Sequence, residues 1–87
     1  MAPSNGGKWV RYRIDLKSRL WNAHVKAFRH TATNEILVFL AIGPNQIPES
    51  ELDDVIDAIL RWAASRNIKD FKEVGRENGH IKFRGYR

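Results

Sequence analysis

The 87-residue sequence contains no cysteine, and this absence removes several kinds of chemistry at once. Disulfide bonds, thiol nucleophiles and cysteine-ligated zinc are all excluded. The longest apolar run, residues 36–42, is far shorter than the roughly 20 residues that a membrane-spanning helix needs. The first seven residues also lack the basic and apolar segments of a secretory signal. We therefore expect a cytoplasmic protein with no membrane contact, stabilised by its core alone.

Size and composition favour one folded domain. A chain of 87 residues buries only roughly 60% of its unfolded surface on folding, which is too little for two separate cores. Hydrophobic residues make up 43% of the chain and charged residues 29%, as is typical of a globular domain. We predict a flexible tail over residues 1–7 and a single domain over residues 8–87.

The charges are sorted along the chain. Residues 1–34 hold seven Lys and Arg against one acid, and residues 67–87 hold six against three. Residues 35–66 reverse this balance, with two Arg against six acids. Like charges gathered on one surface attract a polyanion better than charges spread evenly, so the partner depends on where the two basic segments meet.

Two-residue alternation predicts strands in the first half of the chain. Apolar and polar side chains alternate over residues 9–16 and again over residues 21–30. We expect these segments to form a hairpin of half-buried strands, joined by a short turn at residues 17–19. Residues 36–42 are apolar at every position, which is typical of a strand that is buried on both faces.

One helix is expected over about residues 49–66. Apolar residues recur there at three- and four-residue steps, and Ser50 and Asp53 have the spacing of a capping box. Two short strands are predicted after it, at residues 71–74 and 81–86. The dipeptide Asn78-Gly79 between them favours a type I′ turn, because both central positions of that turn need a positive φ.

These elements predict an α+β fold: an antiparallel sheet of about five strands, in the chain order β-β-β-α-β-β, with one amphipathic helix packed on one face. A single helix leaves the opposite face of the sheet open. Strand alternation assigns to that face basic and aromatic side chains from both ends of the chain: Trp9, Arg11, Arg13, His24, Lys26, Phe28, His30, His80, Lys82, Arg84 and Tyr86.

Single-stranded nucleic acid suits such a face, because rings stack on bases and cations neutralise phosphates. The predicted rings are Trp9, Phe28 and Tyr86, and the predicted cations are Arg11, Arg13, Lys26, Lys82 and Arg84. We expect a small basic nucleic-acid-binding or regulatory protein that contacts the phosphates of single-stranded or structured RNA or DNA. The one expected helix begins with acids, which would repel the phosphates that border a duplex groove.

The histidines suggest other chemistry. His24 and His30 would lie about 20 Å apart on one strand and could not share a metal ion, so we expect no metal and no cofactor. The stretch from Ala58 to Phe83, an expected helix and strand followed by Asn-Gly-His-Ile-Lys-Phe at residues 78–83, resembles the Gly-Ser-His hairpin of HicA-type messenger-RNA interferase toxins. That resemblance implies an enzyme in which His80 cleaves RNA. It covers less than a third of the chain, the serine is absent, and no helix is expected after the hairpin.

A protein-interaction module is a further alternative. An inhibitor or adaptor could dock an acidic protein through the same basic face or through a sheet edge. Phosphate binding should weaken steeply with salt, whereas a protein interface anchored by Trp9 and Phe28 should weaken less. We also expect a homodimer, because the apolar segment 36–42 leaves surface that one helix would not hide.

Overall fold

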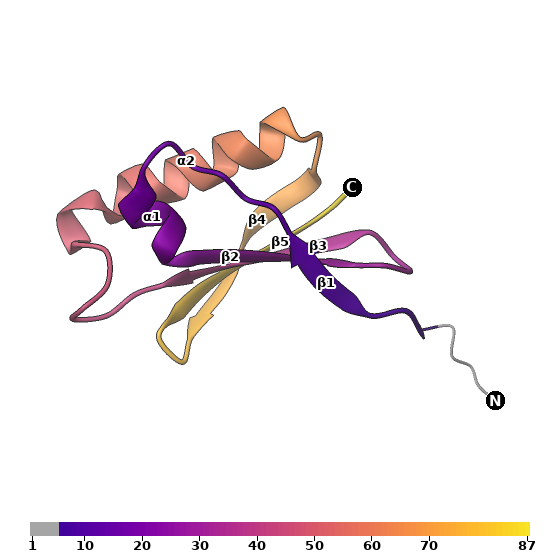
Figure 1. Ribbon diagram of the computed structural model, residues 1–87, viewed down its shortest axis with the longest axis horizontal. Coiled ribbons are helices and arrows are strands. Elements are labelled where there is room, and N and C mark those ends of the chain that lie inside the picture. The colour runs from indigo at the N-terminus through magenta and orange to yellow at the C-terminus, as the bar shows by residue number, and fades with distance from the viewer. Residues whose placement is uncertain (1–5) are drawn as a thin grey trace.

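A five-stranded antiparallel sheet carries one main helix on one of its faces (Figure 1). The computed structural model describes residues 6–87, so most of the predicted tail over residues 1–7 lies outside the described residues. The strands are β1 (Trp9–Tyr12), β2 (Val25–His30), β3 (Glu35–Ala41), β4 (Lys69–Glu77) and β5 (His80–Tyr86). Their order in the sheet is β1-β2-β3-β5-β4.

The helical elements are α1 (Arg19–Ala23), the 3-10 turn η2 (Glu49–Glu51) and α2 (Leu52–Ser65). The predicted α+β architecture is confirmed, and α1 is an additional element between the first two strands. Within residues 6–87, no helix combines the length and the apolar character needed to cross a bilayer.

The core lies between α2 and one face of the sheet. Ala27, Val38 and Phe83 are direct partners across β2, β3 and β5, so their side chains point to the same side. All three have 0% exposure, and they cluster with Val55 and Ile59 of α2. The apolar stripe of the predicted helix is therefore the surface that covers the sheet.

The two ends of α2 differ from the prediction in different ways. The predicted capping box is wrong, because Ser50 lies inside η2 and no side chain caps α2 at its N-terminus. The C-terminus is closed by the backbone: the N–H of Asn67, whose φ is 60°, donates to Ala64, and the N–H of Ile68 donates to Ala63. This pattern is a Schellman motif, and it directs Ile68, 6% exposed, into the core.

The connection between β1 and β2 is the largest departure from the prediction. β1 ends at Tyr12 rather than at residue 16, and β2 begins at Val25 rather than at residue 21. The side chain of Asn22 accepts from the N–H of Leu16 at 2.7 Å and donates to its carbonyl at 2.8 Å. Ser18 caps α1 by accepting from the N–H of Trp21. These bonds satisfy the backbone locally, so the segment needs no strand partner.

Burial alternates along β3, so the prediction that this strand is buried on both faces is wrong. Ile36, Val38 and Leu40 are buried against α2, whereas Leu37 and Phe39 are only half-buried. Figure 1 shows no helix of the described chain on the second side of the sheet. Half of the apolar strand is therefore left facing outward.

The hairpin of β4 and β5 confirms the predicted turn. Asn78 and Gly79 have φ values of 53° and 75°, as a type I′ turn requires. β4 is longer than the predicted residues 71–74 and contains two register shifts, between Lys69 and Lys72 and between Glu73 and Gly75. The first shift allows Phe71 to stack flat on Phe83, with ring centroids 5.7 Å apart and planes 5° from parallel.

Gly85 makes this packing possible, and its replacement should destabilise the fold. A Cβ at Gly85 would lie 2.7 Å from Ile68 Cγ2 and 2.9 Å from Phe71 Cδ1. We expect Gly85→Ala to lower the free energy of unfolding by about 1–3 kcal/mol, measured by urea denaturation. Gly75→Ala is the matched control, because a Cβ there meets nothing within 4 Å. Equal stability of the two variants would contradict this account.

Candidate nucleic-acid interface

The side of the sheet that faces away from α2 is organised in rows of side chains that run across the strands. Directly paired residues of antiparallel strands point to the same side. One central row contains Arg11, Phe28, Leu37, Arg84 and Lys72. The other contains Lys26, Phe39, Lys82 and Gly75. We call this side the open face.

The ends of the open face carry the remaining pairs. Trp9 pairs with His30, and Tyr86 pairs with Glu35, at one end of the sheet. His80 pairs with Ala41 and Glu77 at the other end. Trp9 and Tyr86 are 43% and 41% exposed, so both rings are accessible to a ligand.

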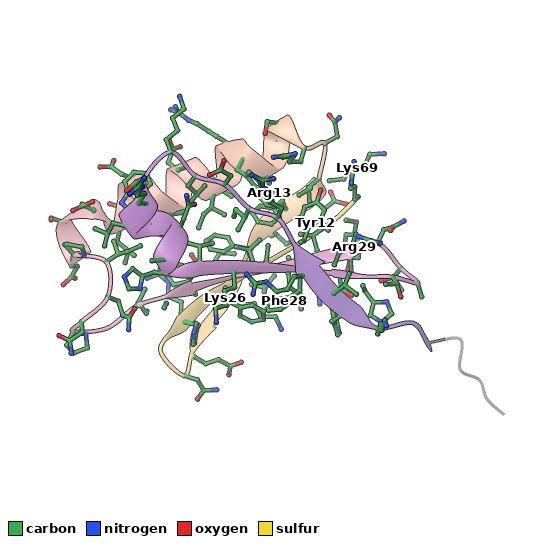
Figure 2. All side chains as sticks on the ribbon, in the orientation of Figure 1. Tyr12, Arg13, Lys26, Phe28, Arg29 and Lys69 are labelled. Atoms are coloured by element: carbon green, nitrogen blue, oxygen red, sulfur yellow. The ribbon has the colours of Figure 1, made fainter. Side chains whose placement is uncertain are left out.

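The predicted site residues therefore share one side of the sheet, with one exception. Figure 2 shows Lys26 and Phe28 below the sheet, away from α2, and Tyr12 and Arg13 above it. Arg13 is the exception because β1 ends one residue before it, so strand alternation no longer determines its direction. Placing Arg13 with the other cations was wrong.

An apolar strip runs through the middle of the open face. It consists of Phe28, Leu37 and Phe39, all half-buried. Phe28 and Phe39 meet edge to face, with ring centroids 5.9 Å apart and planes 68° apart. Since adjacent strands are about 4.8 Å apart, the strip is a continuous apolar surface on two neighbouring strands.

Cations border this strip on both sides. Arg11 and Lys26 lie on the side of β1 and β2, and Lys72, Lys82 and Arg84 lie on the side of β4 and β5. The Arg11 guanidinium carbon lies 5.7 Å from the Phe28 ring centroid, and Lys82 Nζ lies 6.0 Å from that of Phe39. The cations are thus held beside the rings by contact with their π faces.

Two carboxylates share the open face with these cations. Glu35 lies 3.7 Å from Arg84, whose charge it partly neutralises. Glu77 lies at the hairpin end, paired with His80. Arg11, Lys26, Lys72 and Lys82 form no salt bridge within residues 6–87, so positive charge is in excess here.

The histidines do not converge. His30 contacts Trp9 at one end of the open face, with ring centroids 4.9 Å apart. His80 lies at the other end, where its Nδ1 is 3.0 Å from the carbonyl oxygen of Asn78. His24 follows α1 and lies outside the strands. In the described part of the chain, no group of three or more His, Asp and Glu residues could hold a metal ion.

Two side chains with shifted pKa values, Glu73 and Arg76, lie on the α2 side of the sheet. Glu73 pairs with Phe83 in the register and therefore points toward α2. The Arg76 guanidinium donates to it at 2.8 Å, and this hydrogen bond lowers the pKa of Glu73 and raises the pKa of Arg76. Both side chains are solvent-exposed, so this ion pair contributes little to stability.

The sequence analysis did not place Leu37, Phe39 or Lys72 on the open face. Leu37 and Phe39 were assigned to a strand buried on both sides, and Lys72 follows a register shift that reverses the alternation of β4. The strand register supplies the missing information, because Phe39 stands between Lys26 and Lys82. Phe39 therefore lies on the same side of the sheet as Lys26 and Lys82, and it is half-buried rather than part of the core.

A groove of about 660 Å³ lies on the helix side, between residues 15–21 and α2. Its charged groups are partly paired with each other, since Arg61 lies 2.9 Å from Asp57. Trp21 Nε1, also at the groove, donates to Glu51 at 3.0 Å. Mixed and internally paired charges make this groove a weaker site for a polyanion than the open face.

Comparison with known proteins adds no further constraint. No protein-family model, curated protein or solved structure matches the chain.

Proposed function

We propose that the protein binds nucleic acid through the open face and contacts the phosphates with its cations. The observation that carries this proposal is the excess of cations around the half-buried rings on the uncovered side of the sheet. Phosphate contacts supply most of the affinity of non-specific nucleic-acid binding. A cytoplasmic location is part of the proposal, because RNA is available there.

Single-stranded or structured RNA or DNA is a better ligand for this surface than a regular duplex. The face of a five-stranded sheet is wider than the major groove, which admits an α-helix or a two-stranded ribbon. The exposed start of α2 carries Asp53 and Asp54, which repel phosphates. The half-buried rings of the open face offer stacking surfaces instead.

A fluorescence titration tests the proposal. Single-stranded RNA, single-stranded DNA, duplex DNA and poly-glutamate are each titrated at 50 and 200 mM salt. Four or five phosphate contacts predict a slope of log K against log salt of about −3 for single strands, or an affinity loss of about 60-fold between the two conditions. Absence of binding to every nucleic acid would contradict the proposal. Equal affinity for poly-glutamate would indicate an acidic protein partner instead.

The ribonuclease alternative has less support. His80 is exposed at a hairpin end, where its ring contacts Phe39 and a backbone carbonyl. Glu77 is its partner in the strand register, but within residues 6–87 the two side chains form no ion pair. General acid–base cleavage of RNA needs a second group within hydrogen-bond reach of the reacting atoms. Intact RNA at the end of the titration would exclude this alternative.

We also propose that the chain can form a homodimer, which would compete with nucleic acid for the open face. Its support is the apolar strip, which a second copy could cover. A dimer that covered the strip would also hide the cations from nucleic acid. Sedimentation velocity with and without oligonucleotide tests whether a second copy or nucleic acid covers the open face. If both use this face, added oligonucleotide should convert the dimer into a complex of one protein chain with the oligonucleotide.

A further inference from the structure

We propose that Phe28 and Phe39 are two neighbouring base-stacking subsites, which makes the open face selective for unpaired nucleotides. This inference rests on the proposed function and assigns base stacking to two particular rings, of which Phe39 was not expected from the sequence. The argument depends on the geometry of the rings, on the cations beside them and on the accessibility of the bases.

The two rings are positioned rigidly. Phe28 pairs with Leu37 and Phe39 pairs with Lys26, so the rings are diagonal neighbours on the central strands β2 and β3. Their backbones are held by hydrogen-bonded strands on both sides. The opposite face of the same two strands packs against the core, where Ala27, Val38 and Leu40 are fully buried. A stacking surface with this support loses little entropy when a base binds.

Each ring has its own cation. Arg11 lies over Phe28 at 5.7 Å and Lys82 lies over Phe39 at 6.0 Å, measured to the ring centroids. A nucleotide brings a base for the ring and a phosphate for the cation. An exposed cation–π contact contributes about a 2- to 5-fold gain in affinity, whereas stacking on a base contributes about a 5- to 150-fold gain. The exchange is favourable even before the phosphate contact is counted.

Pairing of the bases decides which nucleic acid can use these subsites. In a duplex, both π faces of every base are covered by neighbouring base pairs, so only phosphates can reach the open face. Bases of a single strand can turn toward a protein surface and stack on aromatic side chains. The rings at the end of the sheet have less backbone support, because Trp9 is the first residue of the edge strand β1 and Tyr86 is the last residue of β5.

Two substitutions and an abasic ligand test the inference. Phe28→Leu and Phe39→Leu keep an apolar side chain but remove the ring. Phe71→Leu is the matched control, because Phe71 is also a half-buried ring but packs on Phe83, on the opposite side of the sheet. Each variant is titrated with a single-stranded hexanucleotide and with the same strand lacking its two central bases. Circular dichroism confirms that the variants are folded.

We expect the wild-type protein and Phe71→Leu to bind the intact strand about 10- to 100-fold more tightly than the abasic strand. Phe28→Leu and Phe39→Leu should bind the intact strand about 5-fold or more weakly than the wild type and discriminate less against the abasic strand. Their salt dependence should be unchanged, since the cations remain.

The failure of this inference differs from failure of the proposed function. Equal, salt-dependent binding of intact and abasic strands would overturn stacking but leave phosphate binding intact. A loss of affinity for both strands by the same factor in the two ring variants would also overturn it, because the rings would then act only through the fold. No binding of either strand would refute the proposed function itself.

Discussion

Replacing Arg11, Lys26 and Lys82 together by Gln should reduce affinity for single-stranded nucleic acid by about a hundredfold or more at 50 mM salt. These cations border the apolar strip and form no salt bridge within residues 6–87. Charged hydrogen bonds contribute about 1.5–3 kcal/mol each, and exposure to solvent reduces this value. The slope of log K against log salt should also become less steep by about 2. A fluorescence titration measures both quantities.

The chain offers a control with the same change in net charge. Lys17, Arg61 and Arg66 are exposed and line the groove on the helix side. If the position of the cations matters, replacing these three by Gln should change affinity only a few-fold. If only the overall field matters, both triple variants should weaken binding equally. That second result would remove the open face from the proposal.

The sequence predicted correctly the elements whose backbone hydrogen bonds join residues close together in the chain. The helical period of residues 52–65 and the Asn78-Gly79 turn each specify their own backbone, and both were found. Residues 13–16 were predicted as strand because Ile14 and Leu16 continue the alternation of β1. Both residues do pack against the core, Leu16 at 5% exposure, but they do so from an extended connection held by Asn22. Alternation reports which side chains are buried and does not report strand pairing.

The candidate site could be predicted where it depends only on the alternation of side chains between the two faces of a strand. The parity of β1, β2 and β5 brings Arg11, Lys26, Phe28 and Lys82 to one side, as expected. Phe39 could not be assigned in this way, because a wholly apolar strand has no polar side to identify. Its direction follows from its partners in the register, which are far away in the sequence. Lys72 was missed for a related reason, since a register shift is a property of two strands.

Phe83→Ala should lower the free energy of unfolding by about 3–5 kcal/mol, the largest stability effect that we expect. Phe83 is fully buried, lies between Phe71 and the core residues beneath α2, and pairs with Val38 on β3. Its removal leaves a cavity that the flat stack with Phe71 cannot close. Small domains have a total stability of about 5–15 kcal/mol, so this variant should be close to unfolding at 37 °C. Urea denaturation at 25 °C measures the change.

Tyr86→Ala provides the control on the same strand, because Tyr86 is 41% exposed and should contribute about 1 kcal/mol or less. A Phe83→Ala variant within 1 kcal/mol of the wild type would mean that the β4–β5 stack is not part of the cooperative core.

The stability of β5 also bears on binding. Phe83 lies between Lys82 and Arg84 on β5, so the packing that buries this ring is what holds its two neighbours on the open face. A destabilised β5 should therefore weaken nucleic-acid binding even though Phe83 itself points away from the ligand.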